Sequence, residues 1–159
     1  MDEEFMRAAL ELAKEAFDAG EVPVGCVITR NGEIVGRGRN RREEAKNALA
    51  HAEIEAIADA CAKLGGWRLW ECTLYVTLEP CPMCAGAIVN ARIPRVVYGA
   101  SDGKCGAVRS VCGLFDMGFN HHPKVEAGIL EAECGTLLTD FFQKLRLELR
   151  TRPKWKPKD

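Results

Sequence analysis

The sequence lacks the features that mark several large classes of protein. No apolar run reaches the ~18–20 residues of a bilayer-spanning helix, so we expect no membrane association. No internal repeat or linker divides the 159 residues. The first four residues, Met1-Asp2-Glu3-Glu4, are acidic where a secretory signal is basic. These absences predict a single cytoplasmic domain.

The sequence also has little net charge, with 22 basic residues against 23 acidic residues. Hydrophobic residues make up 47% and charged residues 28%, a balance that excludes disorder and collagen-like repeats. Eight cysteines are present, an even number that four disulfides could use. Disulfide-dense scaffolds, however, are usually small secreted domains without a large core. In a reducing compartment, clustered cysteines more often mark metal binding or catalysis, and their spacing must decide.

Hydrophobic periodicity predicts alternating helices and strands. Apolar residues recur at helical spacing between Phe5 and Ala16, and Asn31-Gly32 is a strong hairpin signal. The predicted order is a helix over 5–16, strands over 24–28 and 33–38, a helix over 50–64 with Ile54, Ile57, Cys61 and Leu64 on one face, a strand over 73–77, a helix from 81, strands over 95–99 and from 125, and a last helix carrying Leu138, Phe141, Phe142, Leu145 and Leu149.

This order of elements predicts the fold class. Strand–helix–strand units imply parallel pairing, while the hairpin requires one antiparallel pair. We therefore expect an α/β protein, a three-layer α/β/α sandwich with a mixed five-stranded sheet. One domain is expected over 1–150, followed by a basic C-terminal tail over 151–159. Residues 100–122 show no period, and a loop of that length is usually functional.

Two short motifs carry the chemistry, His51-Ala52-Glu53 and Pro80-Cys81-Pro82-Met83-Cys84. Each is weak alone, since C-x-x-C can also be a redox pair. Together they offer two thiolates at a helix N-terminus and one imidazole, the ligands that tetrahedral zinc prefers. No fourth Cys or His lies at the usual spacing. His51, Cys81 and Cys84 are therefore predicted to hold one zinc ion with a position open for water, as a catalytic site does.

Glu53 completes this constellation. A carboxylate beside zinc-bound water can take its proton and later deliver it, which is general acid/base catalysis. The pattern H-x-E…P-C-x-x-C is the known signature of zinc deaminases, and this sequence matches it.

Longer stretches extend the match. They are Glu21-Val22-Pro23-Val24-Gly25, the 51–53 motif, Thr77-Leu78-Glu79-Pro80-Cys81-Pro82-Met83-Cys84-Ala85-Gly86-Ala87, Gly99-Ala100-Ser101-Asp102, and shorter pieces within 128–142. With these residues the sequence resembles the bacterial tRNA-specific adenosine deaminases (TadA type) of the cytidine deaminase-like superfamily. The resemblance implies a homodimer that converts adenosine to inosine at the wobble position of a tRNA anticodon. In that reaction zinc-bound hydroxide attacks the base and Glu53 shuttles protons.

The resemblance also implies which residues contact the substrate. Asn40 would contact the base, Val24 would line the pocket, and Asp102 would contact the preceding nucleotide. His121, in the pair Asn120-His121, would lie near the RNA. Cys26 and Cys105 depart from the family pattern, and Cys26 is expected to be a small buried hydrophobe.

The distribution of charge bears on the RNA partner. Residues 144–158 carry seven basic residues and one acidic residue, a local net of +6. Residues 1–143 carry 15 basic and 21 acidic residues, a net of −6. A second basic cluster comprises Arg37, Arg39, Arg41, Arg42 and Lys46. Two such clusters beside a nucleobase site favour phosphate contact over a merely solvated surface.

Three alternatives stay open at this point. The chain could deaminate a free base or nucleoside (cytidine, cytosine or guanine) with the same chemistry. It could also be an RNA-binding module whose zinc is structural, although a fourth ligand is then needed. A second metal among Cys105, Cys112, His121 and His122 is conceivable, but their irregular spacing argues against it.

Overall fold

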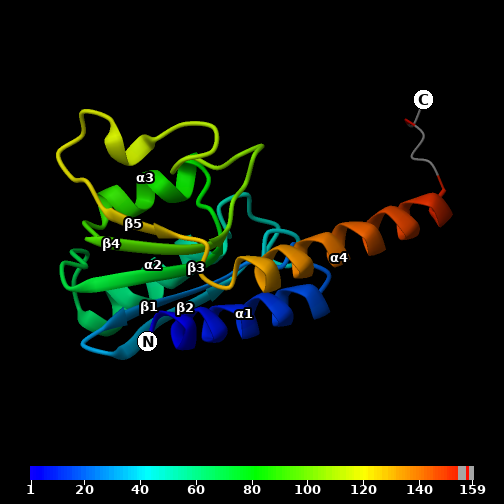
Figure 1. The fold of residues 1–159 in the computed structure, drawn as a ribbon. Coiled ribbons are helices and arrows are strands. Elements are labelled where there is room, and N and C mark those ends of the chain that lie inside the picture. The colour runs from blue at the N-terminus through cyan, green and yellow to red at the C-terminus, as the bar shows by residue number, and fades with distance from the viewer. Residues whose placement is uncertain (154–156, 158–159) are drawn as a thin grey trace.

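The computed structural model describes residues 1–153 and 157. A sheet of five strands lies between two helical layers, with α1 and α4 on one face and α2 and α3 on the other (Figure 1). In chain order the elements are α1 (Asp2–Asp18), β1 (Gly25–Arg30), β2 (Glu33–Arg39), α2 (Ala52–Leu64), β3 (Cys72–Leu78), α3 (Pro82–Asn90), β4 (Arg95–Ala100), the 3₁₀ helix η1 (Leu114–Asp116), β5 (Lys124–Ala127) and α4 (Glu131–Thr151). The predicted three-layer α/β/α sandwich with a mixed sheet is confirmed.

The strand order in the sheet is β2-β1-β3-β4-β5. Strand β1 is antiparallel to both β2 and β3, whereas β3, β4 and β5 are parallel. The antiparallel pair predicted from the hairpin is confirmed, and β1 forms a second antiparallel pair, with β3, that was not predicted. The connection through α2 carries the chain across β1 to its far side, so the first strand of the hairpin is enclosed between β2 and β3.

Two hydrophobic cores form because successive side chains of a strand point to opposite faces. Cys26 and Ile28 of β1 pack under α2 and α3, while Val27 packs under α1 and α4. In β4, Val96 and Val97 divide in the same way between the two cores. The central strands are therefore buried on both faces, as their continuous apolar runs predict.

The backbone of α2 lies very close to β2, closer than a helix that packed on the sheet through its Ile and Leu side chains could lie. Gly36 and Gly38 leave room for the α2 backbone, since a Cβ atom at Gly38 would lie 2.2 Å from the carbonyl oxygen of Ala52. The residues of α2 that face the sheet are thus Ala52, Ala56 and Ala60, all fully buried. The predicted core face of Ile54, Ile57, Cys61 and Leu64 is only half-buried at the side of the helix. The glycines of β2 explain this correction.

Helix α4 extends well beyond the ends of the strands (Figure 1). Of its predicted apolar face, only Phe141 is buried, while Phe142 and Leu149 are 41% and 54% exposed. The helix ends at Thr151, close to the predicted domain boundary at 150. The predicted tail over 151–159 lies largely outside the described residues. Among the described residues, no helix is long and apolar enough to cross a bilayer.

Candidate active site

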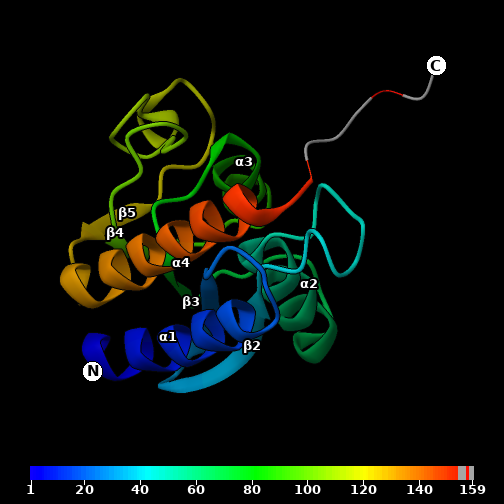
Figure 2. The ribbon, with the colours of Figure 1, turned by 90° about the vertical axis from the view of Figure 1, so that its right-hand side faces the viewer.

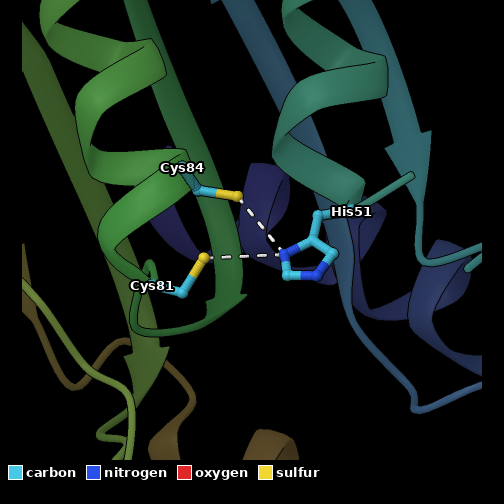
Figure 3. Close-up of side chains that lie close together, drawn as sticks. All are labelled: His51, Cys81 and Cys84. Atoms are coloured by element: carbon cyan, nitrogen blue, oxygen red, sulfur yellow. Dashed lines mark hydrogen bonds between the residues drawn. The ribbon is translucent and has the colours of Figure 1, made fainter. Parts of the chain in front are cut away.

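Three side chains converge where α2 and α3 begin (Figure 3). His51 is the residue just before α2 and has an extended backbone conformation, with φ −80° and ψ 154°. Cys81 occupies the same position before α3, Pro82 is the first helical residue, and Cys84 lies one turn on. Pro is favoured at that first position because its missing N–H would be unpaired there anyway. The predicted opening of this helix at Cys81-Pro82 is confirmed.

The spacing of these ligand atoms fits a tetrahedral metal. The Nδ1 atom of His51 lies 3.6 Å from the Sγ atom of Cys81 and 3.5 Å from that of Cys84. Nitrogen and sulfur bound to one zinc at about 2.0 and 2.3 Å are about 3.5 Å apart at the tetrahedral angle. Among the described residues, no other group of three or more ligating side chains forms such a cluster. The arrangement suits a three-ligand site with an open fourth position.

The electrostatics of the cluster favour a thiolate at Cys81 and proton transfer at Glu53, while the hydrogen bond to Cys81 and burial raise the pKa of Cys84. The pKa of Cys81 is lowered to about 4 by a hydrogen bond from the Cys84 thiol and by His51, and a thiolate is the form that binds metal. Glu53, in the first turn of α2, is only 4% exposed. Its burial raises its pKa to about 7. A carboxyl group with a pKa near neutrality can both accept and donate protons at working pH.

A cavity of about 220 Å³ opens beside the cluster. Its lining residues are Val22, Val24, Asn40, Arg42, His51, Ala52, Glu53, Leu78, Glu79, Cys81, Asp102 and Cys105. Four parts of the sequence prediction therefore border one cavity: two of the predicted metal ligands (His51 and Cys81), Glu53, the residue after β2, and the residues after β4. The volume is close to the lower end of ligand pockets, about 300 Å³, and fits one flat base better than a large ligand.

The predicted substrate contacts Asn40, Val24 and Asp102 all line this cavity. The Asn40 amide is held by its neighbours, since Nδ2 donates to the Val22 carbonyl (3.2 Å) and Oδ1 accepts from the Arg42 N–H (3.2 Å). Oδ1 of Asp102 accepts the N–H groups of Lys104 (3.0 Å) and Cys105 (3.1 Å). Both side chains are thus fixed in place, and their roles toward a substrate stay predictions.

His121 lies apart from the cavity in this chain. Its Nε2 atom is 2.7 Å from the carbonyl oxygen of Ile93, in the turn between α3 and β4, and it is not one of the residues that line the cavity. His122 pairs with the Phe115 carbonyl instead (2.6 Å). Within residues 1–153, neither histidine joins Cys105 or Cys112 in a metal-like cluster.

Motif matching gave no role to two buried glutamates. Glu21, 1% exposed, accepts the N–H groups of Glu43 (3.2 Å) and Glu44 (2.8 Å). Glu79, 2% exposed, accepts bonds from residues 102–110. Burial alone would raise the pKa of Glu79, but N–H donors from Arg109, Ser110 and Asp102 and the Ser110 hydroxyl lower it to about 2. The sequence did contain a signal for both residues, because each lies next to an apolar strand. A carboxylate buried there is costly unless it is hydrogen-bonded, so a structural partner could have been expected.

Comparisons with known proteins place this geometry in a family. The model of MafB19-like deaminases matches residues 1–146. A tRNA-specific adenosine deaminase of Bacillus subtilis (strain 168) is 48% identical over 154 residues, which cover 96% of each chain. One from Haemophilus influenzae is 48% identical and covers 92% of this chain and 86% of its own. A solved structure from a study of A-to-I editing by tRNA:A34 deaminases at the wobble position has a TM-score of 0.82 and 46% identity, covering 85% of this chain and 99% of its own. Guanine deaminase from Nitrosomonas europaea has a TM-score of 0.72 at 25% identity, covering 87% and 83%.

The three-layer fold, the His–Cys–Cys cluster beside a buried glutamate and the family model together define a deaminase. Within this class, the identity of almost half over nearly the whole chain decides the family. The chain belongs to the family of bacterial tRNA-specific adenosine deaminases, which confirms the resemblance drawn from its motifs.

Proposed function

We propose that this chain converts adenosine to inosine at the wobble position of a tRNA anticodon, with one zinc ion held by His51, Cys81 and Cys84. The observation that carries the proposal is the 3.5–3.6 Å ligand cluster beside the buried Glu53, in a cavity of base size. Relatives of 48% identity that bear the name tRNA-specific adenosine deaminase support the tRNA substrate.

Glu53 moves the protons of the reaction. When bound, the zinc ion supplies a Lewis acid that lowers the pKa of water. The Glu53 carboxylate accepts the proton of the attacking water and delivers it to the base, so that ammonia can leave from the ring carbon. A pKa of about 7 suits both steps, because the group is neither permanently charged nor permanently protonated.

The target base must leave its stack to reach the cavity. Val24 and Leu78 line the cavity with apolar groups. Asn40 has one amide hydrogen and one lone pair beyond the two hydrogen bonds that hold it, and these can pair with the edge of the base. In this proposal the cavity therefore fixes the orientation of the base through packing and a single polar side chain.

Two larger hollows adjoin the cavity and are lined by different faces of α4. This helix lies beside α1 (Figure 2). The first hollow, about 420 Å³, shares Val22, Asn40 and Arg42 with the cavity and reaches Lys144 and Arg152. The second, about 770 Å³, shares Val22, Leu78, Asp102 and Cys105 with it and reaches Lys104 and Arg146. A flipped base in the cavity would leave room for the flanking nucleotides in these hollows, with basic side chains near their phosphates.

Two arginines of the basic cluster around Asn40 are already paired with carboxylates and are therefore less available to bind phosphate. Arg39 and Arg41 both contact the Glu44 carboxylate, at 2.9 and 3.3 Å, and Arg41 also reaches Glu55. Arg42 forms no ion pair within the described part of the chain, and it lines both the cavity and the first hollow. We therefore propose Arg42 as the phosphate contact of this cluster.

We also propose that the enzyme is a homodimer of the cytoplasm, where its tRNA substrate resides. Exposed apolar residues support an interface on the segment around η1. Val111, Met117 and Phe119 are 60%, 45% and 51% exposed. Sedimentation equilibrium of the zinc-loaded protein measures the assembly, and a monomer at micromolar concentration would contradict this part of the proposal.

The decisive experiment is incubation of the zinc-loaded enzyme with unmodified tRNA, followed by sequencing for A-to-inosine change. Free adenosine, cytidine, cytosine and guanine are offered in parallel. We expect inosine only at the wobble position. Turnover of a free base alone would favour the second candidate, for which the likeness to a guanine deaminase is the observation.

A further inference from the structure

Glu79 lies where the metal motif meets the loop after β4. It follows β3 directly and precedes Pro80 and Cys81, and its side chain is 2% exposed. Every hydrogen bond that its carboxylate accepts comes from residues 102–110. Oε1 accepts the Asp102 N–H (3.1 Å) and the Ser110 hydroxyl, and Oε2 accepts the N–H groups of Val108 (3.2 Å), Arg109 (2.9 Å) and Ser110 (3.0 Å).

The bond to Asp102 links this carboxylate to the cavity wall. Asp102 and Cys105 both line the cavity. The Asp102 backbone is held by Glu79, and the Asp102 side chain in turn accepts the N–H groups of Lys104 and Cys105. The Asp102 carbonyl also accepts the Gly106 N–H (2.9 Å), but the Glu79 carboxylate is the side chain that holds the Asp102 N–H.

Gly106 shows how closely the loop fits this carboxylate. A Cβ atom at Gly106 would lie 2.4 Å from Cδ of Glu79 and 2.5 Å from the carbonyl oxygen of Asp102. Both distances are far below van der Waals contact. Glycine is required here by the approach of the loop backbone to Glu79 rather than by its own conformation.

We propose that Glu79 is a positioning residue for the substrate wall: its carboxylate fixes Asp102 and Cys105 against the cavity and thereby sets the affinity for RNA. The effect on RNA rests on the proposed function, in which Asp102 contacts a nucleotide. The geometric part, that Glu79 holds Asp102 in place, does not. Although Glu79 also borders the cavity, its carboxylate is engaged by the N–H groups of the loop, and in this role it acts on the substrate through Asp102.

The variant Glu79→Gln isolates the bond to Asp102. If the new NH₂ group took the place of Oε2, it would face three N–H donors, so it is expected to take the place of Oε1. There the Ser110 hydroxyl can rotate and accept a hydrogen bond, but the Asp102 N–H cannot. The substitution thus removes one bond selectively and keeps the three bonds to residues 108–110. Ser110→Ala is the matched control, because it removes the other Oε1 bond and leaves Asp102 held.

Steady-state kinetics with tRNA test the functional part. For Glu79→Gln we expect KM to rise about 10-fold or more, with kcat within about 3-fold and one zinc per chain retained. If Glu79 acts through Asp102, adding Glu79→Gln to Asp102→Ala causes no further loss. Additive losses, or a fall in kcat with loss of zinc, would overturn the proposal, since either result means a direct or merely structural role.

Hydrogen exchange measures the geometric part without any activity. In zinc-loaded Glu79→Gln the Asp102 amide should exchange at least about 10-fold faster than in wild type, while those of Val108 and Arg109 stay protected. Ser110→Ala should leave Asp102 protected. If Glu79→Gln folds poorly, Gly106→Ala is the substitute, because its Cβ atom would push the loop away from the Glu79 carboxylate. It should also make the Asp102 amide exchange faster. Unchanged exchange at Asp102 in the folded variants would overturn the positioning role of Glu79, even if tRNA is deaminated. A wild-type enzyme that is inactive on tRNA would overturn only the proposed function.

Discussion

Two carboxyl groups near opposite ends of the parallel strands β3 and β4, Asp2 and Glu53, are stabilised in opposite protonation states. Where β4 begins, Arg95 contacts the carboxylates of Asp2 and Glu126, each at 2.6 Å, and the Tyr75 hydroxyl donates to Asp2 (2.8 Å). Beyond the other end lies Glu53, which forms no ion pair with any described residue.

The pKa shifts express this contrast. The hydrogen bond from Arg95 holds the pKa of Asp2 well below its ordinary value, so its charged form is favoured. Burial raises the pKa of Glu53 to about 7, so its charged form is disfavoured. The first arrangement stabilises the fold, and the second makes a proton available for chemistry at a cost in stability. Substitutions at the two ends should therefore have separable effects.

The largest effect is expected from removing a metal ligand. Cys84→Ala should lower the zinc content from about one per chain to below about 0.1 and abolish deamination, because two ligands hold zinc poorly. Cys72→Ala is the matched control, since Cys72 is equally buried but lies at the opposite end of β3. Atomic emission for zinc and an inosine assay measure both variants. Full zinc occupancy in Cys84→Ala would contradict the assignment.

Glu53→Gln should leave the metal and the fold intact. We expect deamination to fall about 10³-fold, because an amide cannot shuttle protons. Zinc content should stay near one per chain, and the midpoint of thermal unfolding should stay equal or rise, since a buried carboxyl is replaced by a neutral group of the same size. Glu55→Gln, two residues away on the half-buried face of α2, is the control and should retain activity. Retained activity in Glu53→Gln would reject the proton-shuttle role.

Arg95→Met should give the reverse result, a loss of stability without a loss of chemistry. Removing the guanidinium leaves Glu126 without its partner and Asp2 with the Tyr75 hydroxyl alone. Because these groups are partly exposed, we expect a loss of about 1–2 kcal/mol in the free energy of unfolding. Urea denaturation measures it, with kcat determined on the same samples. Arg7→Met, which breaks an exposed pair with Glu133, should cost less than about 1 kcal/mol. A kcat changed as strongly as the stability would show that the two ends are not independent.

The sequence predicted that His51, Cys81 and Cys84 cluster, because each of the two motifs is local and lies within one turn of a helix start. Their combination in one pattern, and not spacing alone, brought the two motifs together. Strands such as β1 and β4 are also evident from unbroken apolar runs. Their order was harder, since nothing in a strand's own residues says that β1 lies between β2 and β3.

The substrate wall was less predictable because backbone groups hold it. Glu79 reaches donors 23–31 residues further along the chain, and those donors are mostly N–H groups that any residue supplies. The prediction of which face of α2 is buried was wrong for a related reason. Alanines face the sheet only because Gly36 and Gly38 admit the helix backbone, a fit that periodicity within α2 cannot reveal.

The smallest predicted effect concerns pH and tests the stabilising end alone. Asp2 has a lowered pKa in the folded chain, so the free energy that its charge contributes is present above its unfolded pKa of about 3.9 and is lost as pH falls through the folded value. Asp2→Asn should therefore cost about 1 kcal/mol at pH 7, and the difference from wild type should shrink steadily as the pH falls below about 4.

Urea denaturation of Asp2→Asn between pH 7 and pH 3 measures that difference, provided that both proteins remain folded without urea. Glu3→Gln is the matched control, because Glu3 also lies in the first turn of α1 but is exposed and pairs with no arginine in the described part of the chain. The control removes the same favourable interaction with the helix dipole, worth a few tenths of a kcal/mol, and should show little dependence on pH. An equal pH dependence in both variants would mean that the helix dipole, and not Arg95, stabilises the charge of Asp2. The contrast between the two ends of the sheet would then rest on Glu53 alone.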